Sequence, residues 1–107
     1  MRGRDDRRLA ANTVVQVLGV RGHIGTITFT NGEAAGARYM QIFNALAANV
    51  NLGTTVPDMV LIVGAADSES FDFGDQEFST GFSYAITTSA EGSTGPTAAC
   101  WISVSYL

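Results

Sequence analysis

The acidic residues between positions 67 and 77 are the first candidates for a chemical role. They are Asp67, Glu69, Asp72, Asp75 and Glu77. Ca²⁺ takes about six to eight oxygen ligands, which carboxylates supply well. The spacing is not that of an EF-hand loop, and Asp72 should point away from the core because it alternates with Phe71 and Phe73. We interpret the segment as a solvated acidic rim, with a structural calcium site as the alternative, and assign no metal ligand.

The remaining candidates for catalysis are His23, the only histidine, and Cys100, the only cysteine. His23 stands among glycines in RGHIG without a recognisable partner motif, so we expect an exposed turn residue. Cys100 alternates with Ile102 and Val104, which predicts a buried, inert thiol, and a lone cysteine allows no internal disulfide. The sequence has no nucleophile elbow, phosphate-binding loop or dinucleotide fingerprint. We therefore predict no enzyme activity, no catalytic residue and no cofactor.

Composition and charge narrow the possible partners. The chain has 107 residues, so one domain is expected, and only 15% of them are charged, with no lysine. Residues 1–8 hold four Arg and two Asp, whereas the rest of the chain holds two Arg and eight acidic residues. An acidic body repels phosphate, so we expect no specific nucleic-acid binding. No apolar run has membrane-spanning length and no secretory signal is recognisable, so we also expect a soluble protein without a membrane partner.

The elements that would position any site are strands. Alternation with period two and β-branched residues dominate, as in IGTITFT at 24–30, and no segment keeps a period of 3.6 residues. Further strands are expected at 13–20, 36–45, 58–64 and 98–107, with two more inside 70–90. This pattern predicts an all-β protein, a single antiparallel β-sandwich or jelly-roll-like domain of about seven strands over residues 9–107. Residues 1–8 have no apolar anchor and are predicted to be a flexible Arg-rich arm.

Residues 70–90 must contain a break in strand register. Phe71 and Phe73 occupy odd positions, whereas Phe82 and Tyr84 occupy even ones. The face that points to the core therefore changes between them. We place the corner at GDQE (74–77), with a second bend at Ser79-Thr80-Gly81 and Phe78 as an apolar plug.

Candidate interface residues follow from strand alternation. Trp101 alternates with Ser103 and Ser105, opposite the apolar set that begins with Cys100, so it is expected to face outward. Trp is enriched at interaction hot spots. The strand at 36–45 is apolar on both faces, which indicates cover by a second layer or a neighbouring subunit. The candidate interface residues are Trp101, Tyr39, Arg38, Arg7 and Arg8. Trp101 with Arg38 is also the only combination of residues that suggests a glycan-binding site.

Several stretches of the chain resemble a known kind of protein. They are ARYMQIFNA (37–45), TVPDMVLIV (55–63), FSTGFSYAITTSA (78–90) and WISVSYL (101–107). Together they resemble small β-sandwich virion structural proteins of tailed bacteriophages, over roughly residues 12–107. The Arg-rich start and the acidic segment depart from that pattern, which leaves the contact surface open.

The resemblance implies a function without catalysis. It implies a capsid decoration (cement) protein that stabilises the head shell, located in a virion assembled in the host cytoplasm. The implied partners are the major capsid protein of the same virion and further copies of this chain. The alternatives are a tail or fibre-associated module and, from a different class, a glycan-binding β-sandwich.

Overall fold

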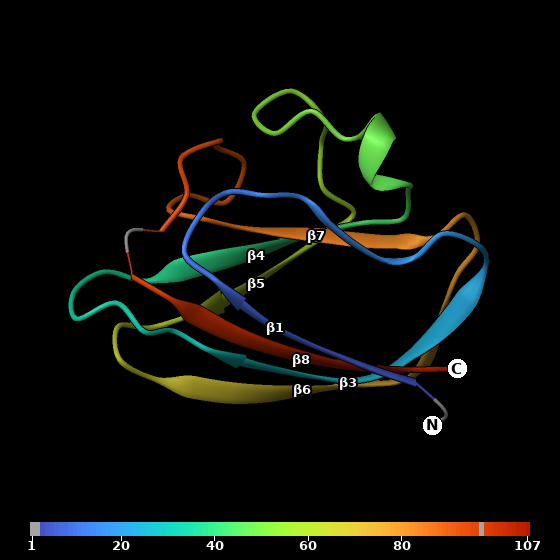
Figure 1. The fold of residues 1–107 in the computed structure, drawn as a ribbon, viewed down its shortest axis with the longest axis horizontal. Coiled ribbons are helices and arrows are strands. Elements are labelled where there is room, and N and C mark those ends of the chain that lie inside the picture. The colour runs from blue at the N-terminus through green and yellow to red at the C-terminus, as the bar shows by residue number, and fades with distance from the viewer. Residues whose placement is uncertain (1–2, 97) are drawn as a thin grey trace.

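The computed structural model describes residues 3–96 and 98–107, and Figure 1 shows that strands dominate it. The strands are β1 (Gly3–Leu9), β2 (Val15–Leu18), β3 (Gly22–Thr30), β4 (Arg38–Phe43), β5 (Met59–Val63), β6 (Ser68–Phe78), β7 (Phe82–Thr87) and β8 (Cys100–Tyr106), with one 3₁₀ turn, η1 (Ala47–Asn49). They form two four-stranded antiparallel sheets, in the orders β1-β8-β3-β6 and β2-β7-β4-β5.

The pairing of the strands identifies the topology. The first strand pairs with the last, β2 with β7, β3 with β6, and β4 with β5. These are the contacts of one long hairpin that has been rolled up, so that its two halves lie in facing sheets. This arrangement of eight strands is a jelly roll. The prediction of an all-β sandwich is confirmed, with eight strands in the described residues rather than about seven.

The additional strand is β1, which lies within the segment predicted to be a flexible arm. Residues 3–9 pair with β8 along their whole length, from Gly3 opposite Tyr106 to Leu9 opposite Cys100. Residues 1–2 lie outside the described part. The arm prediction is therefore wrong for residues 3–8. An edge strand pairs with a neighbouring strand on one side only, and its charged side chains can remain in water. Its sequence therefore shows little of the alternation of apolar residues on which the prediction depended.

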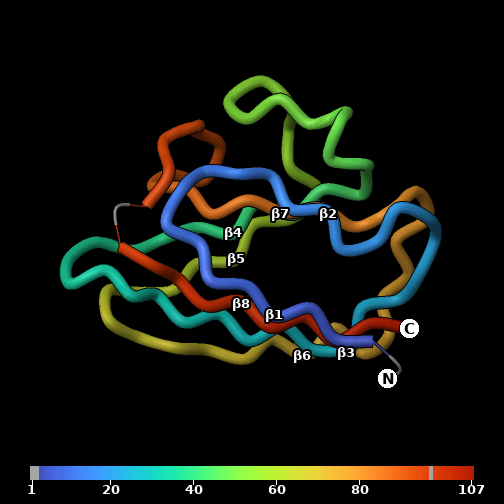
Figure 2. Tube along the Cα trace, in the orientation of Figure 1, coloured from blue at the N-terminus to red at the C-terminus, as the bar shows by residue number. Residues whose placement is uncertain are grey.

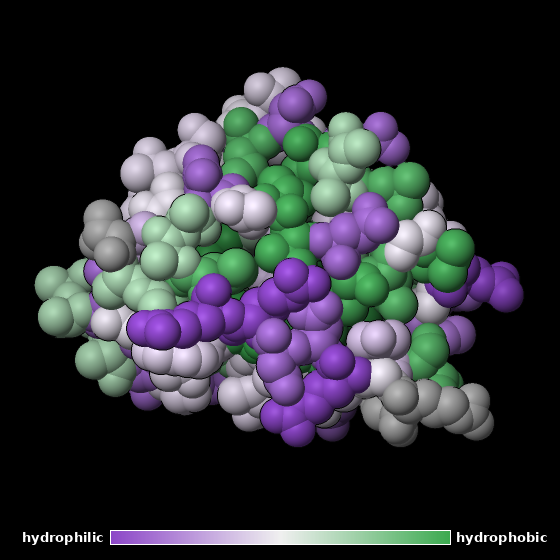
Figure 3. Space-filling view, viewed as in Figure 1, coloured by the Kyte–Doolittle hydropathy of each residue, from purple (hydrophilic) through white to green (hydrophobic). Residues whose placement is uncertain are grey.

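The charges of β1 form short-range pairs. On the inward side, Arg7 Nε donates to Asp5 Oδ1 at 2.8 Å; on the outward side, Arg4 Nε donates to Asp6 Oδ1 at 2.9 Å. The hydrogen bond with Asp5 raises the pKa of Arg7. Figure 3 shows strongly hydrophilic residues as a band across the surface where Figure 1 places β1.

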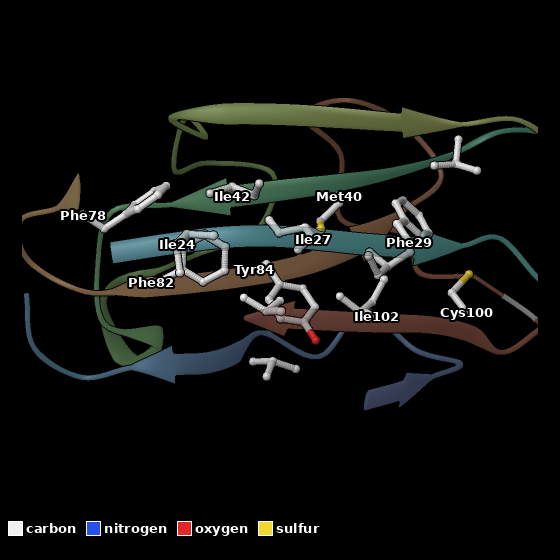
Figure 4. Packing of buried hydrophobic residues seen from close by; sticks show 14 residues of the cluster. Ile24, Ile27, Phe29, Met40, Ile42, Phe78, Phe82, Tyr84, Cys100 and Ile102 are labelled. Atoms are coloured by element: carbon white, nitrogen blue, oxygen red, sulfur yellow. The ribbon is translucent and has the colours of Figure 1, made fainter. Parts of the chain in front are cut away.

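Between the two sheets lies one apolar core. Its fully buried members come from both sheets and include Ile27, Phe29, Met40, Ile42, Tyr84, Ile86, Ile102 and Val104. Cys100 is also fully buried, as predicted, and its burial raises the pKa of its thiol. Figure 4 shows the Tyr84 hydroxyl pointing out of the labelled cluster. That hydroxyl has no hydrogen-bond partner among the described residues, and burial raises its pKa, with a further contribution from Asp5.

The register break within residues 70–90 is a bulge rather than a corner. β6 continues from Ser68 to Phe78, and its pairing with β3 shifts between Ile24 and Thr26. Gly74 and Asp75 both have positive φ, at 57° and 62°. Glycine tolerates this conformation and aspartate reaches it more readily than most residues, so the chain changes face without leaving the sheet. The corner comes later, at residues 79–81, and Phe78 packs edge-on against Phe82 at 4.8 Å between ring centroids.

Two loops cover the outer surface of the sheet β2-β7-β4-β5. They are residues 44–58, which contain η1, and residues 88–96; Figure 1 shows them beyond β7, on the side away from β1, β8, β3 and β6. Beneath them lies a set of outward-pointing but buried side chains, which we call the covered face: Gln41, Phe43, Ser83, Ala85 and Thr87. The loops are tied to it by hydrogen bonds, including Gln41 Nε2 to the Gly92 carbonyl at 2.9 Å and Ser83 Oγ to the Ala45 carbonyl at 2.8 Å.

Candidate functional site

The outer surface of the sheet β1-β8-β3-β6 is the candidate site. Because its inward positions are taken by core residues such as Ile27 and Ile102, the alternate residues point outward. We call this set the hydroxyl face: Arg4, Asp6, Arg8, Thr26, Thr28, Thr30, Ser68, Ser70, Asp72, Trp101, Ser103 and Ser105. Seven of these twelve side chains are serine or threonine, and strand pairing arranges them in rows across the sheet.

Hydrogen bonds between hydroxyls run across this face. Thr30 Oγ1 lies 2.7 Å from Ser68 Oγ, and Thr28 Oγ1 lies 3.1 Å from Ser70 Oγ. Short side chains of this kind lose little rotamer freedom on contact with a partner. The face is therefore polar and pre-arranged, and its two arginines and two aspartates leave it without net charge.

Trp101 is the exception on the hydroxyl face. It is 46% exposed, whereas Cys100 and Ile102 on either side of it are buried, which confirms the predicted outward orientation. The Arg8 guanidinium lies 5.3 Å from the centre of its ring. At an exposed site such a cation–π contact contributes about 0.5–1 kcal/mol. The ring thus lies on the sheet with one cation beside it and much of its apolar surface open.

A hollow of about 360 Å³ adjoins this tryptophan. It is lined by Arg4, Asp6, Arg7, Arg8, Thr28, Thr30, Trp101, Ile102 and Ser103. Arg4 Nε also donates to Ser103 Oγ, at 3.1 Å. Hydrogen bonds from Ser103 and Arg4 lower the pKa of Asp6, so this carboxylate stays ionised. The hollow therefore offers an aromatic surface, guanidinium donors, one carboxylate and several hydroxyls.

The structure brings three of the five candidate interface residues together. Trp101, Arg7 and Arg8 line the same hollow. Arg38 does not join them, because it pairs with Glu33 at 3.1 Å and both side chains are nearly buried. Tyr39 is half-buried on the other sheet, opposite Ile62 of β5. The cation beside Trp101 is therefore Arg8, and the predicted combination of Trp101 with Arg38 is corrected.

The other candidates for chemistry lie apart from this hollow. His23 lies within β3 rather than in a turn, where its backbone exchanges hydrogen bonds with Leu107. Four of the acidic residues lie along β6 and are exposed, and Glu77 is 3.5 Å from Arg21. Within residues 3–96 and 98–107, no three His, Cys, Asp or Glu side chains come together in a way that would hold a metal ion.

Sequence reasoning missed several residues of the hollow. Arg4, Asp6, Thr28, Thr30 and Ser103 were not among the predicted interface residues. The threonines had a signal, since TITFT alternates apolar and hydroxyl residues. Arg4 and Asp6 had none, because nothing in the first nine residues indicates which strand they join.

Comparison with known proteins does not identify the chain: no family model, curated protein or solved structure matches it. In the part of the chain that the structure describes, no helix is long and apolar enough to cross a membrane. The interpretation of the site therefore depends on its geometry.

Proposed function

We propose that this chain is a non-catalytic virion structural protein of a tailed bacteriophage, a decoration protein that binds the head shell through its hydroxyl face. The observation that carries the proposal is Trp101, 46% exposed on a sheet surface that the chain's own loops leave open. The resemblance of the sequence to small phage virion proteins supplies the biological setting. The jelly roll agrees with it, since viral capsid domains commonly have this fold.

The chemistry of the face suits docking on a protein surface. A tryptophan side chain offers about 150–250 Å² of contact area at low conformational cost. Arg8 and Arg4 can hydrogen-bond to carboxylates or carbonyls around it, and the short hydroxyls allow close approach. In this proposal Trp101 is the central anchor, Arg4 and Arg8 surround it, and the major capsid protein supplies the opposing surface. Further copies of this chain bind alongside.

Such a protein would stabilise the shell by mass action. A ligand that binds only the assembled form favours that form by the free energy of all bound copies. Each copy can bind weakly, because many copies on one particle add their contributions. No catalytic group is required, and the proposal assigns none.

Particles with and without this protein test the proposal. We expect particles that lack it to form but to release DNA at lower temperature, as measured by access of a DNA-binding dye during heating. Added purified protein should restore resistance and saturate at a copy number fixed by the shell. The Trp101→Ala protein should fail to restore resistance. Equal melting of both kinds of particle would exclude the decoration role.

The same experiment distinguishes a tail or fibre-associated module. That role predicts heads of normal stability, few copies per particle, and a defect in tail assembly or adsorption. It also predicts that added protein leaves the melting of heads unchanged.

Glycan binding is the second candidate function, and one observation favours it. The hollow beside Trp101 combines an aromatic surface with Arg8, Asp6 and several hydroxyls, and saccharides are bound by such combinations of stacking and polar contacts. This function predicts that soluble sugars bind at Trp101 and that shell stability does not depend on the protein. Titration of the sole tryptophan's fluorescence with sugars measures the first of these.

A further inference from the structure

β1 is held in the sandwich differently from the other strands. As an edge strand it pairs only with β8, and its inward-pointing residues are Gly3, Asp5, Arg7 and Leu9. Only Leu9 of these packs against the apolar core, whereas each of the other described strands contributes at least two apolar side chains to the core or its margin. Backbone pairing with β8 therefore holds β1 in place, and apolar burial adds little.

The charges of β1 are largely paired within the strand itself. Its two ion pairs, Arg4–Asp6 at 2.9 Å and Arg7–Asp5 at 2.8 Å, each join residues of β1. Both pairs would move with the strand if it left the sheet, so its departure breaks neither of them. The remaining cation, Arg8, contacts the exposed tryptophan of β8, and exposed contacts of this kind are weak. Electrostatics therefore offers little resistance to the separation of β1.

The space beneath β1 contains a polar group without a partner. The Tyr84 hydroxyl is buried and has no hydrogen-bond partner among the described residues. It lies close enough to the inward-pointing Asp5 and Arg7 for both charges to influence its pKa. A buried hydroxyl is costly to leave unpaired, and this one would be hydrated whenever β1 moved away. Opening of β1 thus relieves a cost that the closed arrangement carries.

The connection that follows β1 can act as a hinge. Residues 10–14 join the end of β1 in one sheet to the start of β2 in the other, and residues 10–13 are exposed. One side-chain hydrogen bond, from Asn12 Nδ2 to the Ser93 carbonyl, ties this connection to the loop 88–96. Five extended residues span at most about 17 Å. That reach allows β1 to extend to a neighbouring molecule that faces the same edge of the sandwich.

This edge also presents apolar surface. Leu9 at the end of β1 and Val17 and Leu18 on β2 are only partly buried, and Figure 3 shows hydrophobic residues beside the hydrophilic band of β1. Two copies that face each other at the β1–β2 edge would cover such residues on both molecules. A second copy of this chain therefore gains apolar burial at this edge in addition to any pairing of strands.

We propose that β1 is exchanged between two copies of this chain, so that β1 of each copy pairs with β8 of the other. The β8 edge fits this occupant because Gly3–Leu9 already matches Cys100–Tyr106 along seven residue pairs. Exchange recreates these pairs between molecules and closes a symmetric dimer at low cost. The closed and exchanged forms contain the same β1–β8 contacts, so a high local concentration of copies favours exchange. The proposal concerns only copies of this chain and does not depend on the decoration role.

Disulfide formation between full-length chains tests the proposal. Asp6 lies directly opposite Ser103, so Asp6→Cys and Ser103→Cys combined in one chain should form an internal disulfide. When the two single variants are mixed at about 1 mM, as for neighbouring linked copies, exchange should join positions 6 and 103 of different chains. Peptide mapping detects this bond. Ser70→Cys replaces Ser103→Cys in the control mixture, because Ser70 is exposed but pairs with β3; it should cross-link at least about tenfold less.

The comparison of the two mixtures decides the outcome. All variants retain Cys100, which is fully buried, so it contributes equally to each mixture. If the double variant closes internally but the mixed chains cross-link no more than the control, β1 stays with its own chain and the proposal is rejected. If the double variant does not close and the mixtures are equal, the geometry for a disulfide is absent and the hinge variants decide.

Changes in hinge length provide that second test. Removal of Ala10 and Ala11 shortens the connection, and a short, strained hinge favours exchange. Light scattering should show a dimer whose dissociation constant is at least about tenfold lower than that of the unaltered chain. Insertion of two glycines at the same place should leave the protein monomeric. A shortened variant that folds but remains a monomer at high concentration would overturn the proposal.

Discussion

The two outer faces of this sandwich contain similar side chains in opposite surroundings. Both carry threonine and serine, and both carry one large aromatic residue: Trp101 on the hydroxyl face and Phe43 on the covered face. Two loops seal the covered face, so that Phe43 is 1% exposed, whereas Trp101 is 46% exposed. The chain thus uses its longest connections to extend its core on one side only, and the other side remains exposed.

The hydroxyls show the same contrast. Thr87 on the covered face is fully buried, accepts a hydrogen bond from Gln41 Nε2 at 2.8 Å and donates to the Ser89 carbonyl at 2.7 Å. Within the described part of the chain, the side chain of Thr28 on the hydroxyl face pairs only with Ser70 Oγ, at 3.1 Å, next to solvent. A buried polar group is costly to leave unpaired and an exposed one is not. The covered face should therefore govern folding, and the hydroxyl face should govern binding.

Phe43→Ala tests the covered face and should have the largest effect. Truncation of a buried Phe removes apolar contact and leaves a cavity, at a cost of about 3–5 kcal/mol. We expect the free energy of unfolding to fall by that amount in urea denaturation, without change at the Trp101 hollow. A loss below about 1 kcal/mol would mean that the two loops do not seal this face.

Trp101→Ala tests the open face. We expect binding to the head shell to weaken by roughly 2 kcal/mol or more. The free energy of unfolding should fall by only about 1 kcal/mol, mainly from the lost contact with Arg8. Co-sedimentation with shells measures the first quantity and thermal denaturation the second. If the isolated protein unfolds instead, Trp101 belongs to the fold and the two faces do not differ as described.

A matched pair of threonine substitutions gives the smallest and sharpest contrast. Thr87→Val should cost about 1–3 kcal/mol, because it leaves one N–H of the fully buried Gln41 side chain without its acceptor. Thr28→Val should change stability by less than about 0.5 kcal/mol. Chemical denaturation of both variants under one condition measures the difference. Equal effects would show that burial by the loops does not distinguish the two hydroxyls.

Much of the sandwich was predictable because its interior strands alternate. Five of the predicted strands agree with β2, β3, β4, β5 and β8 to within a few residues at either end, and the outward position of Trp101 follows from the same rule. The bulge in β6 was visible as a change of face but was interpreted as a corner. A bulge and a corner both shift the register, and only the pairing with β3 distinguishes them.

The parts that were not predictable depend on contacts distant in sequence. β1 forms because its backbone pairs with β8, and nothing in the charged sequence of β1 indicates this partner. Arg38 was expected at an interface, but Glu33 holds it in a nearly buried pair. Arg8 reaches Trp101 only because strand pairing places the two residues opposite each other. Local sequence patterns therefore predicted the strands, whereas the residues of the site could be identified only from the pairing of the strands.

The nested pairing of the strands has a consequence for the order of folding. β4 and β5, the pair closest in sequence, can meet early, whereas β1 must wait for β8, almost the whole chain away. Closing a longer loop costs more entropy, and distant pairings slow folding. Figure 2 shows the start of β1 beside the end of β8, where Gly3 lies opposite Tyr106. A ribosome-bound chain thus lacks the partner of β1 until β8 emerges, and the arginines beside Trp101 are positioned only after β2 to β7 have been made.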